Sequence, residues 1–149
     1  MNTSKLIPLL TLAALLTLTV RASESDLKAD LAKMQGKWKA TVTTDRGSGK
    51  WTLEFKENKT KILIENSDNE TVFKGESEFK LEEVGKFRAY TYFNLKILSG
   101  DREGQTILTD GKTRSSVYKL GEETFTTVSG LTEDETEKPR LITWEKVSK

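Results

Sequence analysis

The side chains that most often carry enzyme chemistry are missing from this sequence. Its 149 residues include no cysteine and no histidine. Such a chain has no thiolate nucleophile, no disulfide, no imidazole base and no Cys- or His-ligated metal site. The remaining reactive groups are carboxylates, amines, hydroxyls and phenols, which are abundant on ordinary protein surfaces. The commonest routes of hydrolytic and metal-dependent catalysis are therefore excluded.

Neighbouring carboxylates are the remaining candidates for acid–base catalysis. They occur as Glu82-Glu83, as Glu122-Glu123 and as Glu133-Asp134-Glu135. An acid–base pair requires two carboxyl groups held in different environments across a cleft, whereas these groups lie in predicted turns where water solvates them alike. The third run also lacks the ligand spacing of a calcium loop. We therefore predict no catalytic residue, no metal site and no cofactor, and we expect a protein that is not an enzyme.

One predicted strand places aromatic and cationic side chains in a row. Successive side chains of a strand point to opposite faces, so positions two apart share a face. One face holds Arg88, Tyr90, Tyr92 and Asn94, and the other holds Phe87, Ala89, Thr91 and Phe93. Either face is able to point inward, because tyrosine has an apolar body and a polar tip.

The two orientations predict different interiors. With the tyrosine face inward and two residues of a later strand beside it, the protein has a polar aromatic pocket suited to an anionic amphiphile. This candidate ligand pocket consists of Arg88, Tyr90, Tyr92, Arg114 and Tyr118. With the phenylalanine face inward, the interior is filled by the protein's own side chains, as in many small β-barrels. The sequence leaves both interiors open.

The first 22 residues have the features of a secretory signal peptide. Lys5 provides a positive start, an apolar run extends from Leu6 to Val20, and Val20-Arg21-Ala22 fits a cleavage site. The run is shorter than the roughly 20 apolar residues that a spanning helix needs. We therefore predict cleavage near Ala22, a secreted or periplasmic product, no stable membrane insertion, and a single folded domain at residues 23–149.

The charges of the chain are balanced and interspersed. Lys and Arg total 24, Asp and Glu total 23, and the formal net charge is +1. Removal of residues 1–22 takes away two basic groups, Lys5 and Arg21, and leaves the folded part almost neutral. A nucleic-acid partner is not expected, because such binding depends on clustered positive charge. The oligomeric state is not indicated by any sequence feature.

A short helix is predicted to open the folded part. Ser23-Glu24-Ser25-Asp26 resembles a capping box, in which side chains satisfy the first free amides of a helix. Leu27, Leu31 and Met34 follow at helical spacing, and Gly36 suits the left-handed residue that ends a helix. The pattern predicts about three turns whose apolar stripe packs against another element.

From Gly36 onward the apolar period changes to two, which indicates strands. Trp38, Ala40 and Val42 alternate with polar residues, and so do Trp51, Leu53 and Phe55. Further strands are predicted at residues 61–66, 70–74, 77–82, 86–98, 105–109, 113–120, 123–129 and 140–147. Short turns separate them, of which Asp110-Gly111 is the clearest. Parallel pairing needs crossovers of a dozen or more residues, so the sequence predicts an all-β, antiparallel, up-and-down barrel of about eight to ten strands, with a sandwich as the alternative.

Three segments resemble one known family. Asp30 to Lys39, with its Gly36-Lys37-Trp38 triplet, is similar to the opening of lipocalin-like domains of unknown function that are common in planctomycetes. Ser116 to Phe125 and Leu141 to Val147 resemble that family's later strand-turn-strand and its closing strand. The cysteine and the Arg-Pro-Thr-Glu segment that members often carry before the last strand are absent here. The resemblance implies a lipocalin-like barrel closed at one end.

In that fold Trp38 would lie at the closed end, with a basic side chain from a late strand over its ring. Arg140 and Lys146 are the two candidates for this structural cation–π contact. The resulting functional hypothesis is an exported, non-catalytic binding module for a small apolar or amphipathic ligand. The alternative is a structural or protein-interaction domain of the cell envelope.

Overall fold

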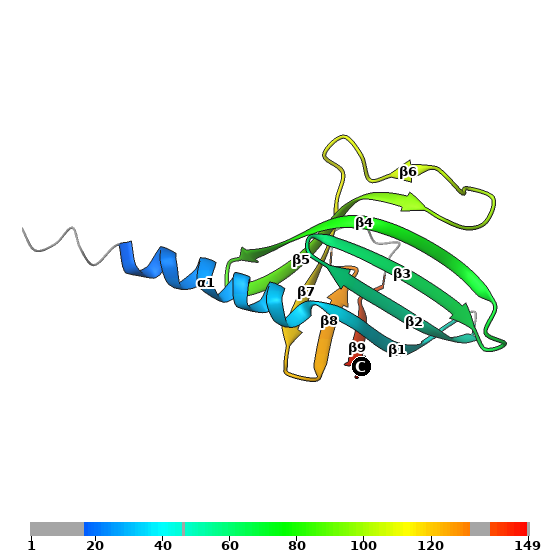
Figure 1. Cartoon of the computed structure of the whole chain (residues 1–149), viewed down its shortest axis with the longest axis horizontal. Helices are drawn as coiled ribbons and strands as arrows, with labels where there is room; N and C mark the ends of the chain where they lie inside the picture. The colour runs from blue at the N-terminus through cyan, green and yellow to red at the C-terminus, as the bar shows by residue number, and fades with distance from the viewer. Residues whose placement is uncertain (1–16, 46, 132–137, 149) are drawn as a thin grey trace, which may run out of the picture.

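A computed structural model describes residues 17–45, 47–131 and 138–148 (Figure 1). Most of the predicted signal peptide and the acidic segment 132–137 lie outside the described residues. The helix α1 spans Thr17–Met34. Nine strands follow: β1 Gly36–Thr44, β2 Gly47–Lys56, β3 Lys59–Asn66, β4 Thr71–Val84, β5 Phe87–Ile97, β6 Thr106–Ile107, β7 Arg114–Leu120, β8 Thr124–Ser129 and β9 Arg140–Lys146.

The strands form a closed antiparallel barrel, which confirms the predicted fold class. Eight of them pair in the order β1-β2-β3-β4-β5-β7-β8-β9, and β9 returns to β1. Short β6 pairs only with β5, beyond the part of β5 that faces β7. Asp110 and Gly111 both have positive φ and form the predicted turn, but it does not join a hairpin, because β6 and β7 each pair with β5.

Helix α1 begins earlier than the predicted capping box. It starts at Thr17, so residues 23–26 lie inside the helix, where their amides take part in helical hydrogen bonds instead of needing a cap. The end of the helix agrees with the prediction: it stops at Met34, and Gly36 has φ +105°. The last turns of α1 lie at one end of the barrel, and its first turns extend away from the barrel (Figure 1).

Two predicted strands, residues 70–74 and 77–82, are one continuous strand in the structure. Gly75 between them is not a turn: it pairs with Ile62 of β3, and an added Cβ there would come within 2.9 Å of the Leu95 side chain. A glycine inside a strand often marks such a close approach rather than a break. As one strand of 14 residues, β4 extends from one end of the barrel to the other.

The core extends from the barrel end covered by α1 to Val42 of β1 and Ile142 of β9. Met34 and Trp38 are fully buried, and the Trp38 indole N–H donates to the Met34 carbonyl at 2.7 Å. Phe55 packs edge-on against Phe79, Tyr90 and Phe125 at centroid distances of 5.3 to 5.9 Å. These aromatic rings fill the closed half of the barrel.

Candidate functional site

The tyrosine face of β5 points inward. Tyr90 is buried in the core, whereas Phe87 on the opposite face is 62% exposed. The register changes at Asn94, which has φ +51° and lies beside the bulge between β4 and β5. Asn94 therefore leaves the tyrosine face on which the sequence placed it, and its amide donates to Glu78 at 2.9 Å on the exposed surface.

The five candidate pocket residues divide between the two ends of the barrel. Register pairs Arg88 with Tyr118 next to α1, and Tyr92 with Arg114 toward the other end, with Tyr90 between them. The structure therefore brings the five residues onto one inward face but does not gather them around one space.

Arg88 and Tyr118 are engaged by the helix. The Arg88 guanidinium donates to Asp30 Oδ2 at 2.7 Å and to Asp26 Oδ2 at 3.1 Å, and the Tyr118 hydroxyl donates to Asp30 Oδ2 at 2.8 Å. Asp30 is 8% exposed, and these hydrogen bonds offset the cost of burying its carboxylate. Two of the five residues thus fasten the helix to the barrel.

Burial raises the pKa of Tyr90 and of Tyr118 above that of a solvated phenol. Both hydroxyls therefore stay protonated and act as donors, Tyr90 to Thr60 at 3.1 Å and Tyr118 to Asp30. The hydrogen bond to Asp30 also raises the pKa of Arg88. All three groups are structural at neutral pH, and none is poised for proton transfer.

The inward-facing side chains become accessible toward the barrel end opposite α1, which we call the mouth. Along β3, Thr60 is buried, but Ile62 and Ile64 are only partly buried. The same change occurs along β7, from buried Tyr118 through half-buried Ser116 to exposed Arg114. Along β9 it runs from buried Trp144 to exposed Arg140. On these three strands the inward side chains are therefore more exposed at this end, although Val42 of β1 and Ile142 of β9 remain buried there.

The mouth combines an apolar wall with cationic rim residues. Its wall includes Trp51, Ile62 and Tyr92, which pack against the core but are partly exposed, and Ile64, which is also partly buried. Arg114 and Arg140 occupy the rim. The Arg140 guanidinium lies 5.7 Å from the centre of the Trp51 ring. The ring centroids of Trp51 and Trp144 are 6.4 Å apart.

The two candidates for the Trp38 contact lie at opposite ends of β9. The Lys146 ammonium is 5.1 Å from the centre of the Trp38 ring and also donates to the Lys33 carbonyl at 2.8 Å. Arg140 cannot reach Trp38, because six residues of an extended strand span roughly 20 Å. Lys146 therefore makes the cation–π contact with Trp38 at the closed end, and Arg140 lies at the mouth.

Sequence reasoning missed Asp30 and most of the mouth wall. Asp30 lies between Leu27 and Leu31 on the helix face that packs against the barrel, and a carboxylate on an apolar stripe is a readable signal for a buried ion pair. Ile62 and Ile64 also show the alternation of an inward face. The solvent exposure of Ile62 and Ile64 could not be predicted from the sequence, because it depends on which end of the barrel α1 covers.

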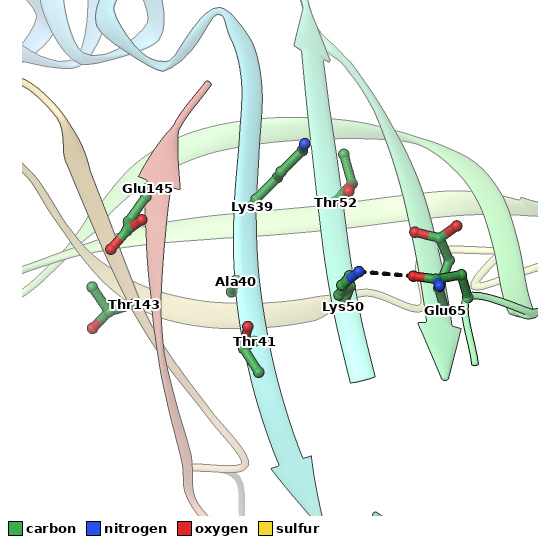
Figure 2. Close-up of a pocket in the computed structure, with 9 residues that line it drawn as sticks. Lys39, Ala40, Thr41, Lys50, Thr52, Glu65, Thr143 and Glu145 are labelled. Atoms are coloured by element: carbon green, nitrogen blue, oxygen red, sulfur yellow. Dashed lines mark hydrogen bonds between the residues drawn. The ribbon is translucent and has the colours of Figure 1, made fainter. Parts of the chain in front are cut away.

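A hollow lies on the outer surface of the barrel (Figure 2). It has a volume of about 630 Å³ and is lined mainly by outward residues of three adjacent strands: Lys39, Thr41, Lys50, Thr52, Thr143 and Glu145. Glu65 and Asn69 border it, and the Lys50 ammonium donates to Asn69 Oδ1 at 2.7 Å. This lining is polar and carries both charges.

The part of the chain that the structure describes holds no group of three or more acidic, histidine or cysteine side chains able to bind a metal ion. Over those same ranges no helix is long and apolar enough to cross a membrane. No protein-family model, curated protein or solved structure matches the chain.

Proposed function

We propose that this protein is a non-catalytic binding module that holds one small amphipathic molecule in the mouth of its barrel. The observation that carries the proposal is the gradient of exposure along the inward faces of β3, β7 and β9. A barrel filled at one end and accessible at the other resembles a cup, and apolar walls with few polar anchors are typical of small-molecule sites.

The side chains of the mouth favour an anionic head group. An alkyl or aromatic body would lie against Trp51, Ile62 and Ile64, while a carboxylate or sulfonate would lie at the rim near Arg114 and Arg140. Burial of the body contributes about 25 cal/mol per Å² of apolar surface. The charge at the rim fixes the orientation of the ligand.

The family and the location are part of the same proposal. The Gly36-Lys37-Trp38 opening, followed by an antiparallel barrel, supports membership of the lipocalin-like family of unknown function that is common in planctomycetes. We also infer that the chain is exported, with cleavage near Ala22. Helix α1 would then begin at about Ser23 and keep Asp26, Asp30 and Met34, which hold it to the barrel.

A titration with decanoate tests the ligand site. We expect decanoate to bind the wild-type chain and to change the fluorescence of half-buried Trp51, with decan-1-ol binding more weakly. Ser116→Trp places a large ring on the inward face of β7 and should abolish binding. Lys119→Trp is the matched control, because Lys119 is exposed on the outer face of the same strand. Equal binding by the two variants, or no binding by the wild type, would contradict the proposal.

A further inference from the structure

The outer surface of the barrel carries a row of apolar side chains. On β7, Tyr118 is buried and points inward, so its neighbour Val117 points outward. Val128 on β8, Leu141 on β9 and Ala89 on β5 point outward for the same reason. Outward positions of such strands are usually polar, because water solvates that face. Apolar side chains at the outward positions of four strands therefore need an explanation.

The register places these four side chains directly opposite one another. Ala89 pairs with Val117, Val117 pairs with Val128, and Val128 pairs with Leu141. Directly opposed side chains of antiparallel strands lie on the same face, with Cβ atoms about 4.5–5.5 Å apart. We call these four residues the outer row. Isolated apolar residues on a surface are normal, whereas a contiguous group is typical of an interaction site.

Phe87 and Val84 extend the outer row at its β5 end. Phe87 lies two residues before Ala89 on the same face, and it pairs with Val84 of β4. Phe87 is 62% exposed and Val84 is 58% exposed, while Leu141 at the other end of the row is 66% exposed. Of the five large apolar side chains that are exposed among the described residues, three therefore lie in this row or beside it.

The two ends of the outer row differ in shape. Ala89 is the smallest of the four side chains and is 4% exposed, so this end is recessed, whereas Leu141 projects from the surface. Val117 and Val128 between them are half-buried. Such a row fits a copy of itself turned end for end, because each Leu141 then faces the Ala89 of the other copy. The projecting leucines also fill the gap that the curvature of two barrels leaves at the ends of the row.

The side chains beside the outer row do not oppose this fit. Lys119 lies two residues after Val117 on β7 and has Thr126 of β8 as its neighbour. When the row is turned about an axis parallel to the strands, Lys119 faces Thr126 of the other copy, so like charges do not meet. Glu82 continues the row on β4, but its carboxylate is already paired with Lys80 at 2.8 Å. The remaining flanking positions on β5, β7 and β9 carry hydroxyl groups, from Thr91, Ser115 and Thr143.

We propose that two copies of this protein associate face to face through the outer row, about a two-fold axis parallel to β7 and β8. A contact in which the same patch serves both copies is the commonest arrangement of homodimers. The outer row with Val84 and Phe87 is small beside the roughly 20–30 residues a side of a standard interface, so the dimer is weak and reversible. This proposal is independent of ligand binding in the mouth.

Sedimentation velocity of the full chain between about 10 μM and about 1 mM tests the dimer. We expect the sedimentation coefficient to rise with concentration from that of a monomer to that of a dimer. Leu141→Lys removes the projecting side chain from both copies and should raise the dissociation constant by roughly a hundredfold. Val72→Lys is the matched control and should dimerise as the wild type does, because Val72 is 63% exposed but lies near the start of β4, away from the row.

Exchange of the large and the small end of the row tests the fit itself. Ala89→Leu sets a second projecting side chain against Leu141 of the other copy and should weaken the dimer by about tenfold. The added side chain extends outward from the barrel, and thermal unfolding checks that the variant folds. The double variant Ala89→Leu/Leu141→Ala again sets a large side chain against a small one and should recover dimerisation.

Four results would overturn the proposal. A wild-type chain that is still monomeric at about 1 mM would show that the row does not associate. Equal weakening by Leu141→Lys and Val72→Lys would mean that exposed apolar residues associate without specificity. Association that is undiminished in Leu141→Lys would place the contact on another surface, such as the apolar run from Leu6 to Val20. A stronger dimer in Ala89→Leu would mean that apolar area, and not the fit of the row to its own copy, drives association.

Discussion

Asp30 links the helix to two strands of the barrel through one oxygen atom. Its Oδ2 accepts hydrogen bonds from Arg88 on β5 and from Tyr118 on β7. Arg88 and Tyr118 had the residue types of a ligand pocket, but the protein itself occupies them. An arginine and a tyrosine of this kind can either hold a helix or bind a ligand. Here they hold α1, because the Asp30 carboxylate already accepts their hydrogen bonds.

The importance of this link is tested by Asp30→Asn. Hydrogen bonds to a charged group contribute about 1.5–3 kcal/mol each, and the variant loses the charge while Arg88 keeps only its exposed contact with Asp26. We expect the free energy of unfolding in urea to fall by about 2 kcal/mol.

Asp26→Asn is the matched control for this change. The Asp26 side chain is 61% exposed, and exposed ion pairs are worth at most about 1 kcal/mol. A loss as large in Asp26→Asn as in Asp30→Asn would show that burial of the carboxylate does not set the strength of the link.

At the scale of elements, β4 and β5 are the two longest strands of the barrel and are joined on their outer face by side chains. Glu82 on β4 accepts from the Thr91 hydroxyl on β5 at 2.6 Å and forms an ion pair with Lys80 at 2.8 Å. The hydrogen bond from Lys80, followed by that from Thr91, lowers the pKa of Glu82. Thr91 is 1% exposed although it lies on the outer face, so this contact covers part of the sheet.

The lowered pKa predicts a contribution to stability that depends on pH. Because the folded-state pKa lies below the unfolded value of about 4.3, the contribution is complete above that value and is lost as the pH falls through the folded-state pKa. Glu82→Gln should therefore lose less free energy of unfolding than the wild type between pH 7 and pH 3. Thr91→Val removes one of the two donors and should give an intermediate dependence. Parallel curves for wild type and Glu82→Gln would contradict the assignment.

For the whole molecule, the sequence predicted the barrel but not the end at which its inward side chains become more exposed. Alternation around Trp38, Trp51 and Leu53 was sufficient for the strands, because each has one buried face. The ends of the barrel depend on contacts between residues far apart in sequence, such as Asp30 with Tyr118, which no local pattern contains.

The short ladder between β1 and β9 could not be predicted from the sequence for the same reason. The alternation of β1 is regular along Trp38, Ala40 and Val42, and that of β9 is regular from Ile142 to Trp144. Whether two such strands pair along their full length depends on how the barrel closes, which is a property of all eight strands together. Gly75 is a further example. Glycine is typical of turns, but Gly75 lies inside β4, where its backbone closely approaches the Leu95 side chain.

A ligand in the mouth would couple binding to the stability of the entire barrel, because only the folded barrel presents the site. Decanoate at 100 times its dissociation constant should raise the free energy of unfolding by about 2.7 kcal/mol. Arg140→Gln removes a rim charge, so we expect it to need about tenfold more decanoate for the same stabilisation, equivalent to about 1.4 kcal/mol. Stabilisation by decan-1-ol, which has no charge, should change little in Arg140→Gln.

The neutral ligand matters because Arg140 also covers the Trp51 ring. If the variant weakened decanoate and decan-1-ol equally, the arginine would act through packing alone, and the preference for an anionic head group would be wrong. Lys119→Gln, which removes a charge from the outer face of β7, should leave both ligands unaffected. Thermal unfolding at a series of ligand concentrations measures all three variants in the same way, and a melting temperature that rises with decanoate only when Arg140 is present would assign the head group to the rim.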